Sequence, residues 1–147
     1  MKQILFVEDN GSYSKEVKER LSSLRLQYDV TSAYTVLEAL SWWEEKAKEF
    51  DCIVLDLQIN PEGLETDEYD EYAPLYGMAF LDKILKDLPK EEILKISEKV
   101  IISSAFLPQL DDWLRIRKRD LKSVTRVRKS TDGIGKLVNE IERKCGK

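Results

Sequence analysis

The chain has 147 residues, of which 42% are hydrophobic and 35% are charged, and its formal net charge is −4. This length and balance predict one folded domain with a hydrophobic core and exclude a disordered chain. The negative net charge provides no overall attraction to nucleic acid, so a nucleic-acid partner is not expected. The sequence contains no histidine, which excludes His-based catalytic triads and metal sites with His ligands.

The sequence shows no pattern of a targeting segment or a membrane span, and we therefore expect a cytoplasmic protein without a membrane partner. The apolar stretch after the first residues is too short for a signal peptide, and no stretch approaches the roughly 20 apolar residues of a membrane span. The two cysteines, Cys52 and Cys145, form neither a disulfide framework nor a metal-binding pattern.

The first half of the chain alternates between strand and helix patterns. The apolar stretch Ile4–Val7 predicts a buried strand that ends in Glu8 and Asp9. Apolar residues at helical spacing then predict a helix that ends near residue 25. A less apolar strand over 28–33, near an edge of the sheet, and a helix capped by Thr35 follow.

The third predicted strand is a buried apolar stretch, Cys52–Leu55, that leads to Asp56. An acidic stretch without helical or strand period follows over about 60–76, with three tyrosines interleaved. Long irregular loops in compact domains tend to be functional or disordered, and both alternatives stay open here. A helix predicted to begin at Gly77 follows this stretch and ends at Pro89.

The last part of the chain predicts two more strands. A helical turn or two over 90–97 precedes an apolar strand that ends in Ser103 and Ser104. A helix that ends near Lys122 leads to a weaker strand ending in Lys129, and a final helix is expected from about 131 or 132 to Lys144.

This alternation predicts an α/β fold, with five parallel strands and helices on both faces of the sheet. We expect the doubly wound, flavodoxin-like strand order 2-1-3-4-5, which places the first and third strands side by side. Glu8, Asp9 and Asp56 would then converge at the carboxyl end of the sheet, where ligands bind. Carboxylates in close contact repel one another, and Mg²⁺, which prefers oxygen ligands, relieves that repulsion. The alternative is that these acids only terminate strands and face water.

An acid pair, a lone Asp, a hydroxyl and a Lys, in that chain order and each at a strand end, resemble the receiver domain of two-component response regulators. The resemblance covers nearly the whole chain, so we expect a single receiver-like domain over 1–147, without an output domain and with an insertion at about 60–76. It implies that Asp56 accepts a phosphoryl group from a histidine kinase or phosphotransfer protein. It further implies contacts from Ser104 and Lys129 to the phosphoryl oxygens.

The same resemblance implies a Mg²⁺ site formed by Glu8, Asp9, Asp56 and the backbone carbonyl of Gln58. Ser103 should face the other side of its strand. Two positions depart from the family pattern. Ser130 stands where the family usually has proline after the lysine, and Arg126 stands where it often has an aromatic residue that moves with the hydroxyl.

A local basic region lies around the helix before Lys122 and the strand that follows it. It is either a solvated surface or an electrostatic face for an acidic partner, including the chain's own acidic insertion. We therefore expect the insertion to fold over the active-site side and restrict access to it. The basic region consists of Arg115, Arg117, Lys118, Arg119, Lys122, Arg126 and Arg128.

The favoured function is a stand-alone phosphoacceptor that signals by contact with an unknown downstream protein, and not a true enzyme. The alternative is a receiver-like interaction module that does not depend on phosphorylation. A third hypothesis, a Mg²⁺-dependent phosphohydrolase, usually needs a general acid two residues after the nucleophile, where this chain has Gln58.

Overall fold

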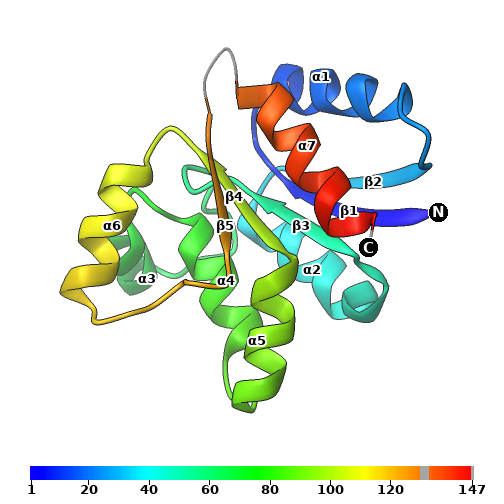
Figure 1. The fold of residues 1–147 in the computed structure, drawn as a ribbon. Coiled ribbons are helices and arrows are strands. Elements are labelled where there is room, and N and C mark those ends of the chain that lie inside the picture. Colours follow the sequence, from blue (N-terminus) through cyan, green and yellow to red (C-terminus); the bar gives the residue numbers. More distant parts are fainter. Residues whose placement is uncertain (130–132, 147) are drawn as a thin grey trace.

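The computed structural model describes residues 1–129 and 133–146, which form one parallel five-stranded sheet with helices on both faces (Figure 1). The strand order is β2-β1-β3-β4-β5, so the predicted flavodoxin-like order is confirmed. The strands are β1 (Lys2–Val7), β2 (Tyr28–Ala33), β3 (Cys52–Leu55), β4 (Val100–Ser104) and β5 (Thr125–Arg128).

The helices lie in two layers on the two faces of the sheet (Figure 1). One layer consists of α1 and α7, and the other contains α2, α4, α5 and α6. The helices are α1 (Gly11–Ser22), α2 (Val36–Lys46), α3 (Thr66–Tyr72), α4 (Gly77–Leu85), α5 (Lys90–Lys99), α6 (Leu107–Ile116) and α7 (Gly133–Cys145), with a 3-10 turn, η1, at Ala47–Glu49. Among the described residues, no helix has the length and apolar character required to cross a bilayer.

Burial explains why the central strands read as continuous apolar stretches. Every residue of β3 and β4 is buried, because helices cover both faces of these strands. Successive side chains point to opposite faces. Ile101 packs in the layer of α1 and α7, whereas Ile102 packs in the layer of α2 and α4.

Side-chain caps begin the two helices that follow β1 and β2. The Asn10 side chain accepts a hydrogen bond from the backbone N–H of Tyr13, and Thr35 Oγ1 accepts one from Glu38. These bonds satisfy N–H groups that lack a partner within the first helical turn.

Helix α6 ends at Ile116, so the predicted end near Lys122 is wrong. The N–H of Arg119 donates to the carbonyl of Leu114, and the N–H of Lys118 donates to that of Arg115. Lys118 adopts a left-handed φ of 52°. These features define a Schellman motif, which closes a helix regardless of the periodicity that follows it.

Two other helices differ from the prediction. Helix α5 spans ten residues, longer than the turn or two expected over 90–97. Its half-buried Ile93 and Ile96 pack on the hydrophobic core, which supports a full-length helix. The expected start of the last helix lies outside the described residues, and its described part begins at Gly133.

The insertion over 60–76 is ordered and contains helix α3. The backbone N–H of Glu65 donates to the Glu68 carboxylate, and Glu68 pairs with Lys83 of α4 at 2.8 Å. Tyr72 and Leu75 are buried in the core. A seven-residue helix is too short for a clear period, which is why the sequence pattern missed it.

The insertion packs beside α4 and α6 (Figure 1). The Tyr72 ring stacks on Trp113 of α6, with centroids 5.9 Å apart, and its hydroxyl donates to Asp82 at 2.8 Å. Arg117 donates to the backbone carbonyl of Glu71 at 2.7 Å. Among the described residues, no ion pair joins an acidic side chain of the insertion to the basic region, so the expected charge attraction is not seen and the contact is made through a backbone carbonyl.

Candidate functional site

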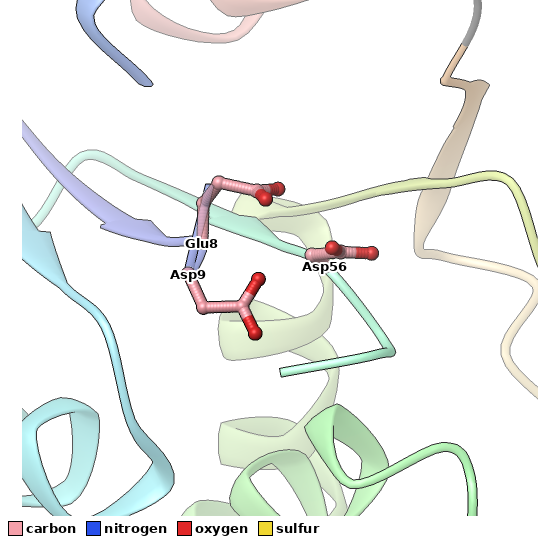
Figure 2. Close-up of side chains that lie close together, drawn as sticks. All are labelled: Glu8, Asp9 and Asp56. Atoms are coloured by element: carbon pink, nitrogen blue, oxygen red, sulfur yellow. The ribbon is translucent and has the colours of Figure 1, made fainter. Parts of the chain in front are cut away.

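Three acidic side chains meet at the carboxyl ends of β1 and β3 (Figure 2). Val7 is paired with Leu55 in the sheet, and the N–H of Asp56 donates to the carbonyl of Val7 at 2.9 Å. Carboxylate oxygens of Glu8, Asp9 and Asp56 lie within 4.8 Å of one another. The predicted convergence of these acids is therefore confirmed.

The environments of the three carboxylates differ. Glu8 is 1% exposed and Asp56 is 5% exposed, whereas Asp9 is exposed. Backbone N–H groups orient both buried side chains: that of Asn10 donates to Glu8 at 3.0 Å, and that of Leu57 donates to Asp56 at 2.8 Å. The cluster thus combines two fixed, buried carboxylates with one that faces solvent.

Lys129 lies at the same end of the sheet and contacts the two buried acids. Its Nζ donates to the two carboxylate oxygens of Glu8 at 2.7 and 2.8 Å and to Asp56 Oδ2 at 3.2 Å. Its backbone N–H donates to the carbonyl of Ser104 at 3.0 Å, which fixes the end of β5 against β4. The structure therefore brings the predicted lysine to the predicted acids.

Burial and crowding shift the titration of these groups. Burial, followed by the nearby charge of Asp56, raises the pKa of Glu8 to about 7. The same two causes raise the pKa of Asp9. Burial by itself lowers the pKa of Lys129, but its hydrogen bonds to Glu8 and the charge of Asp56 outweigh burial, so the net pKa is raised.

The donor set fits a hard divalent cation. Carboxylate oxygens are the ligands that Mg²⁺ prefers, and clustered like charges gain from a cation between them. Gln58 is exposed and lines the same pocket as Asp56, in keeping with the expected position of its backbone near the site. Metal binding, and the ligand roles of these residues, stay predictions.

The two serines at the end of β4 have different surroundings. Ser103 Oγ lies 3.1 Å from the Tyr13 hydroxyl on the α1 side of the sheet. Ser104 Oγ is fully buried and accepts a hydrogen bond from the N–H of Phe106 at 3.0 Å. Ser103 thus faces the α1 layer, and the role expected for Ser104 stays a prediction.

A pocket of about 470 Å³ opens beside Asp56 and Lys129. The sequence patterns did not indicate two of its aromatic residues, Tyr13 and Phe106. Each stands near the start of a helix that follows a strand of the site, which is the signal that marks them. The pocket is lined by Tyr13, Asp56, Gln58, Ala105, Phe106, Lys129 and Ile134.

Among the described residues that line this pocket, none belongs to the insertion. Restriction of access by the insertion stays a prediction. The residue three before Lys129, Arg126, pairs with Asp111 of α6. Ser130, the other departure from the family pattern, lies outside the described residues.

Gly77, the first residue of α4, lies against the backbone of Asp56 and Leu57. Its N–H donates to the carbonyl of Leu57 at 2.8 Å. A Cβ atom built on Gly77 would lie 2.2 Å from the backbone oxygen of Asp56 and 2.9 Å from Leu57 Cα. Only glycine permits α4 to begin this close to the strand end that carries Asp56.

Solved structures with the same fold include response regulator receiver domains. The phosphorylated cyanobacterial phytochrome response regulator RcpA matches with a TM-score of 0.67 and 20% identity, over 98% of this chain and 93% of that one. The chain has the receiver-domain fold.

Two further receiver structures agree. The Mn²⁺-bound response regulator Rcp1 matches with a TM-score of 0.66 and 19% identity, over 97% of this chain and 92% of that one. A CheY-like receiver protein from Methanospirillum hungatei JF-1 matches with a TM-score of 0.64 and 19% identity, over 99% and 94%. No family profile and no curated protein matches the sequence.

Proposed function

We propose that this chain is a phosphoacceptor receiver domain that takes a phosphoryl group on Asp56 and signals through protein contact. The observation that carries the proposal is the cluster of Glu8, Asp9, Asp56 and Lys129 at the carboxyl ends of β1, β3 and β5. The receiver fold supports it, because RcpA was solved in a phosphorylated form and Rcp1 with Mn²⁺.

In the proposed reaction an Asp56 carboxylate oxygen attacks the phosphorus atom of the donor. A new P–O bond forms while the bond to the donor's leaving group breaks and takes the electron pair with it. Such transfers depend on in-line positioning and on neutralising the charge of the phosphoryl oxygens. Bound Mg²⁺, held by Glu8, Asp9, Asp56 and the Gln58 carbonyl, would supply most of that neutralisation.

Two side chains of the chain itself complete the neutralisation. The Lys129 ammonium already lies 3.2 Å from Asp56 Oδ2 and carries a positive charge into a largely buried place. The Ser104 oxygen accepts from Phe106, so its own O–H remains a donor for a phosphoryl oxygen. A histidine kinase or phosphotransfer protein would supply the phosphoryl group.

A specific observation favours the alternative of an interaction module independent of phosphorylation. Lys129 donates to two oxygens of Glu8 and one of Asp56, which offsets part of the charge of these buried carboxylates without a metal. In this alternative the pairing is retained, and the binding surfaces act without modification of Asp56.

Labelling by acetyl phosphate separates the two functions. With Mg²⁺ present, the phosphoacceptor gains the mass of one phosphoryl group, and hydroxylamine or base removes it. The variant Asp56→Asn abolishes the gain, whereas Asp51→Asn, at the opposite end of β3, retains it. Unchanged mass in the wild-type chain would favour the phosphorylation-independent module.

A further inference from the structure

Tyr13 is an aromatic residue at the site for which the proposed reaction has no use so far. It stands in the first turn of α1 and lines the pocket that contains Asp56 and Lys129. The Lys129 ammonium lies 4.6 Å from the centroid of its ring. This separation is typical of a cation held against an aromatic face.

Tyr13 is held in place by one backbone contact and two contacts of its side chain. Its backbone N–H donates to the side chain of Asn10 at 3.1 Å, and its hydroxyl lies 3.1 Å from the buried Ser103 Oγ. Its ring also contacts that of Phe6, with centroids 6.4 Å apart. A ring held this way presents a permanent face, whereas the long Lys129 side chain has many rotamers and needs a surface to lie on.

The ring contact differs in kind from the other contacts of Lys129. All three ammonium donors point at carboxylate oxygens of Glu8 and Asp56 in this structure. A phosphoryl group on Asp56, or a divalent cation at the acids, would require those donors to change partners. An aromatic face attracts the charge without using a particular N–H, so it remains available during the exchange.

We propose that Tyr13 is a positioning residue that keeps the Lys129 ammonium beside Asp56 when its carboxylate partners change, with Ser103 holding the ring in place. The proposal rests on the proposed phosphoacceptor function for its kinetic consequence, but the contact itself is testable without phosphorylation. The proposal also assigns a role to Ser103. It faces the opposite side of β4 from Ser104, and it contacts Tyr13 of α1 and not the phosphoryl group.

The contact can be measured by NMR on the resting protein. Protons on the Lys129 ε-carbon above the Tyr13 ring shift upfield, and the signal is assigned by its loss in Lys129→Met. The shift should persist when Mg²⁺ is added and in Tyr13→Phe, and should disappear in Tyr13→Leu. A Lys129 signal without an upfield shift in the wild-type protein, or one lost on adding Mg²⁺, would overturn the proposal.

The consequence is measured as the rate of labelling by acetyl phosphate. Tyr13→Leu should slow labelling about three- to tenfold, as expected for loss of a cation–aromatic contact. Tyr13→Phe should stay within about twofold of wild type, because it retains the ring and loses only the contact of its hydroxyl with Ser103. In the Lys129→Met background, Tyr13→Leu should have no further effect, because the ring then has no ammonium to position.

A matched control separates positioning from packing. Tyr28 packs in the same helix layer but at the start of β2, the opposite end of the sheet. Tyr28→Leu should leave both the Lys129 signal and the labelling rate unchanged. Equal slowing by Tyr13→Leu with and without Lys129, or slowing by Tyr13→Phe as large as by Tyr13→Leu, would contradict the proposal. If the wild-type chain is not labelled at all, the proposed function fails and the NMR measurement alone decides this inference.

Discussion

The Lys129 ammonium donates hydrogen bonds to both carboxylate oxygens of Glu8, at 2.7 and 2.8 Å, although the two residues are 121 positions apart in the sequence. Glu8 is buried, so its charge depends on this partner. This ion pair joins the residue after β1 to the residue after β5 at the carboxyl end of the sheet. Glu8, which is expected to bind metal, is therefore already paired with Lys129.

Removing this lysine should therefore destabilise the protein in a pH-dependent way. In Lys129→Met, Glu8 loses its cation, and the free energy of unfolding should fall by about 1–3 kcal/mol near pH 8. The loss should be smaller near pH 5, because Glu8 is then protonated and needs no cation, so that only the contact of Lys129 with Asp56 is lost. Urea unfolding at both pH values tests this; an equal loss at both would show that Glu8 is not the group involved.

The Glu8 carboxyl should also control metal binding through its protonation. Its pKa is raised to about 7, so a proton competes with Mg²⁺ below that pH and the affinity for Mg²⁺ should rise as pH increases through it. Calorimetric titration near pH 6 and pH 8 measures the change. Glu8→Gln should remove most of this pH dependence, and a wild-type affinity that is constant with pH would contradict the expectation.

The raised pKa of Glu8 also determines how the stability of the metal-free chain varies with pH. Because the pKa of Glu8 in the folded state lies above the ordinary glutamate value of 4.5, its stabilising contribution is fully present below that value and is lost as pH rises through about 7. Mg²⁺ should restore stability at the high end by mass action. Melting curves with and without Mg²⁺ across this range test both statements.

Gly77→Ala should displace Asp56. The added Cβ would clash with the backbone oxygen of Asp56, so the start of α4 or the strand end must move. We expect a loss of about 1–3 kcal/mol in the free energy of unfolding and slower labelling of Asp56. Gly135→Ala is the matched control. Gly135 lies in helix α7, and a Cβ atom built on it would meet only the Arg20 side chain, at 4.0 Å. That variant should be neutral or stabilising by up to about 1 kcal/mol.

The insertion should stabilise the fold through Tyr72. Tyr72→Ala removes the stacking on Trp113 and the hydrogen bond to Asp82, and we expect it to cost about 2–4 kcal/mol. Tyr69→Ala is the control within the same helix; Tyr69 is 40% exposed, so its truncation should cost less than about 1 kcal/mol. Equal effects in urea unfolding would mean that α3 does not depend on its contact with α6.

Much of this architecture is readable from local patterns. Short apolar stretches alternate with helical periods, and such alternation permits few arrangements besides a parallel sheet wound on both sides. The acids Glu8, Asp9 and Asp56 follow two of those stretches directly. Their meeting point was therefore predictable once the strands were, because neighbouring parallel strands end at the same edge.

The partners of these acids were decided by the tertiary structure. Nothing in the sequence indicates that Lys129 contacts Glu8 as well as Asp56, or that Tyr13 lies under the ammonium, since periodicity reports burial and not which residues meet. Helix α3 shows the same limit. Its seven residues carry too little period to be recognised, and its position is set by the contact of Tyr72 with Trp113, which lies far along the chain. Local sequence thus determined the elements and the strand ends, whereas long-range packing determined how the side chains at those ends are held.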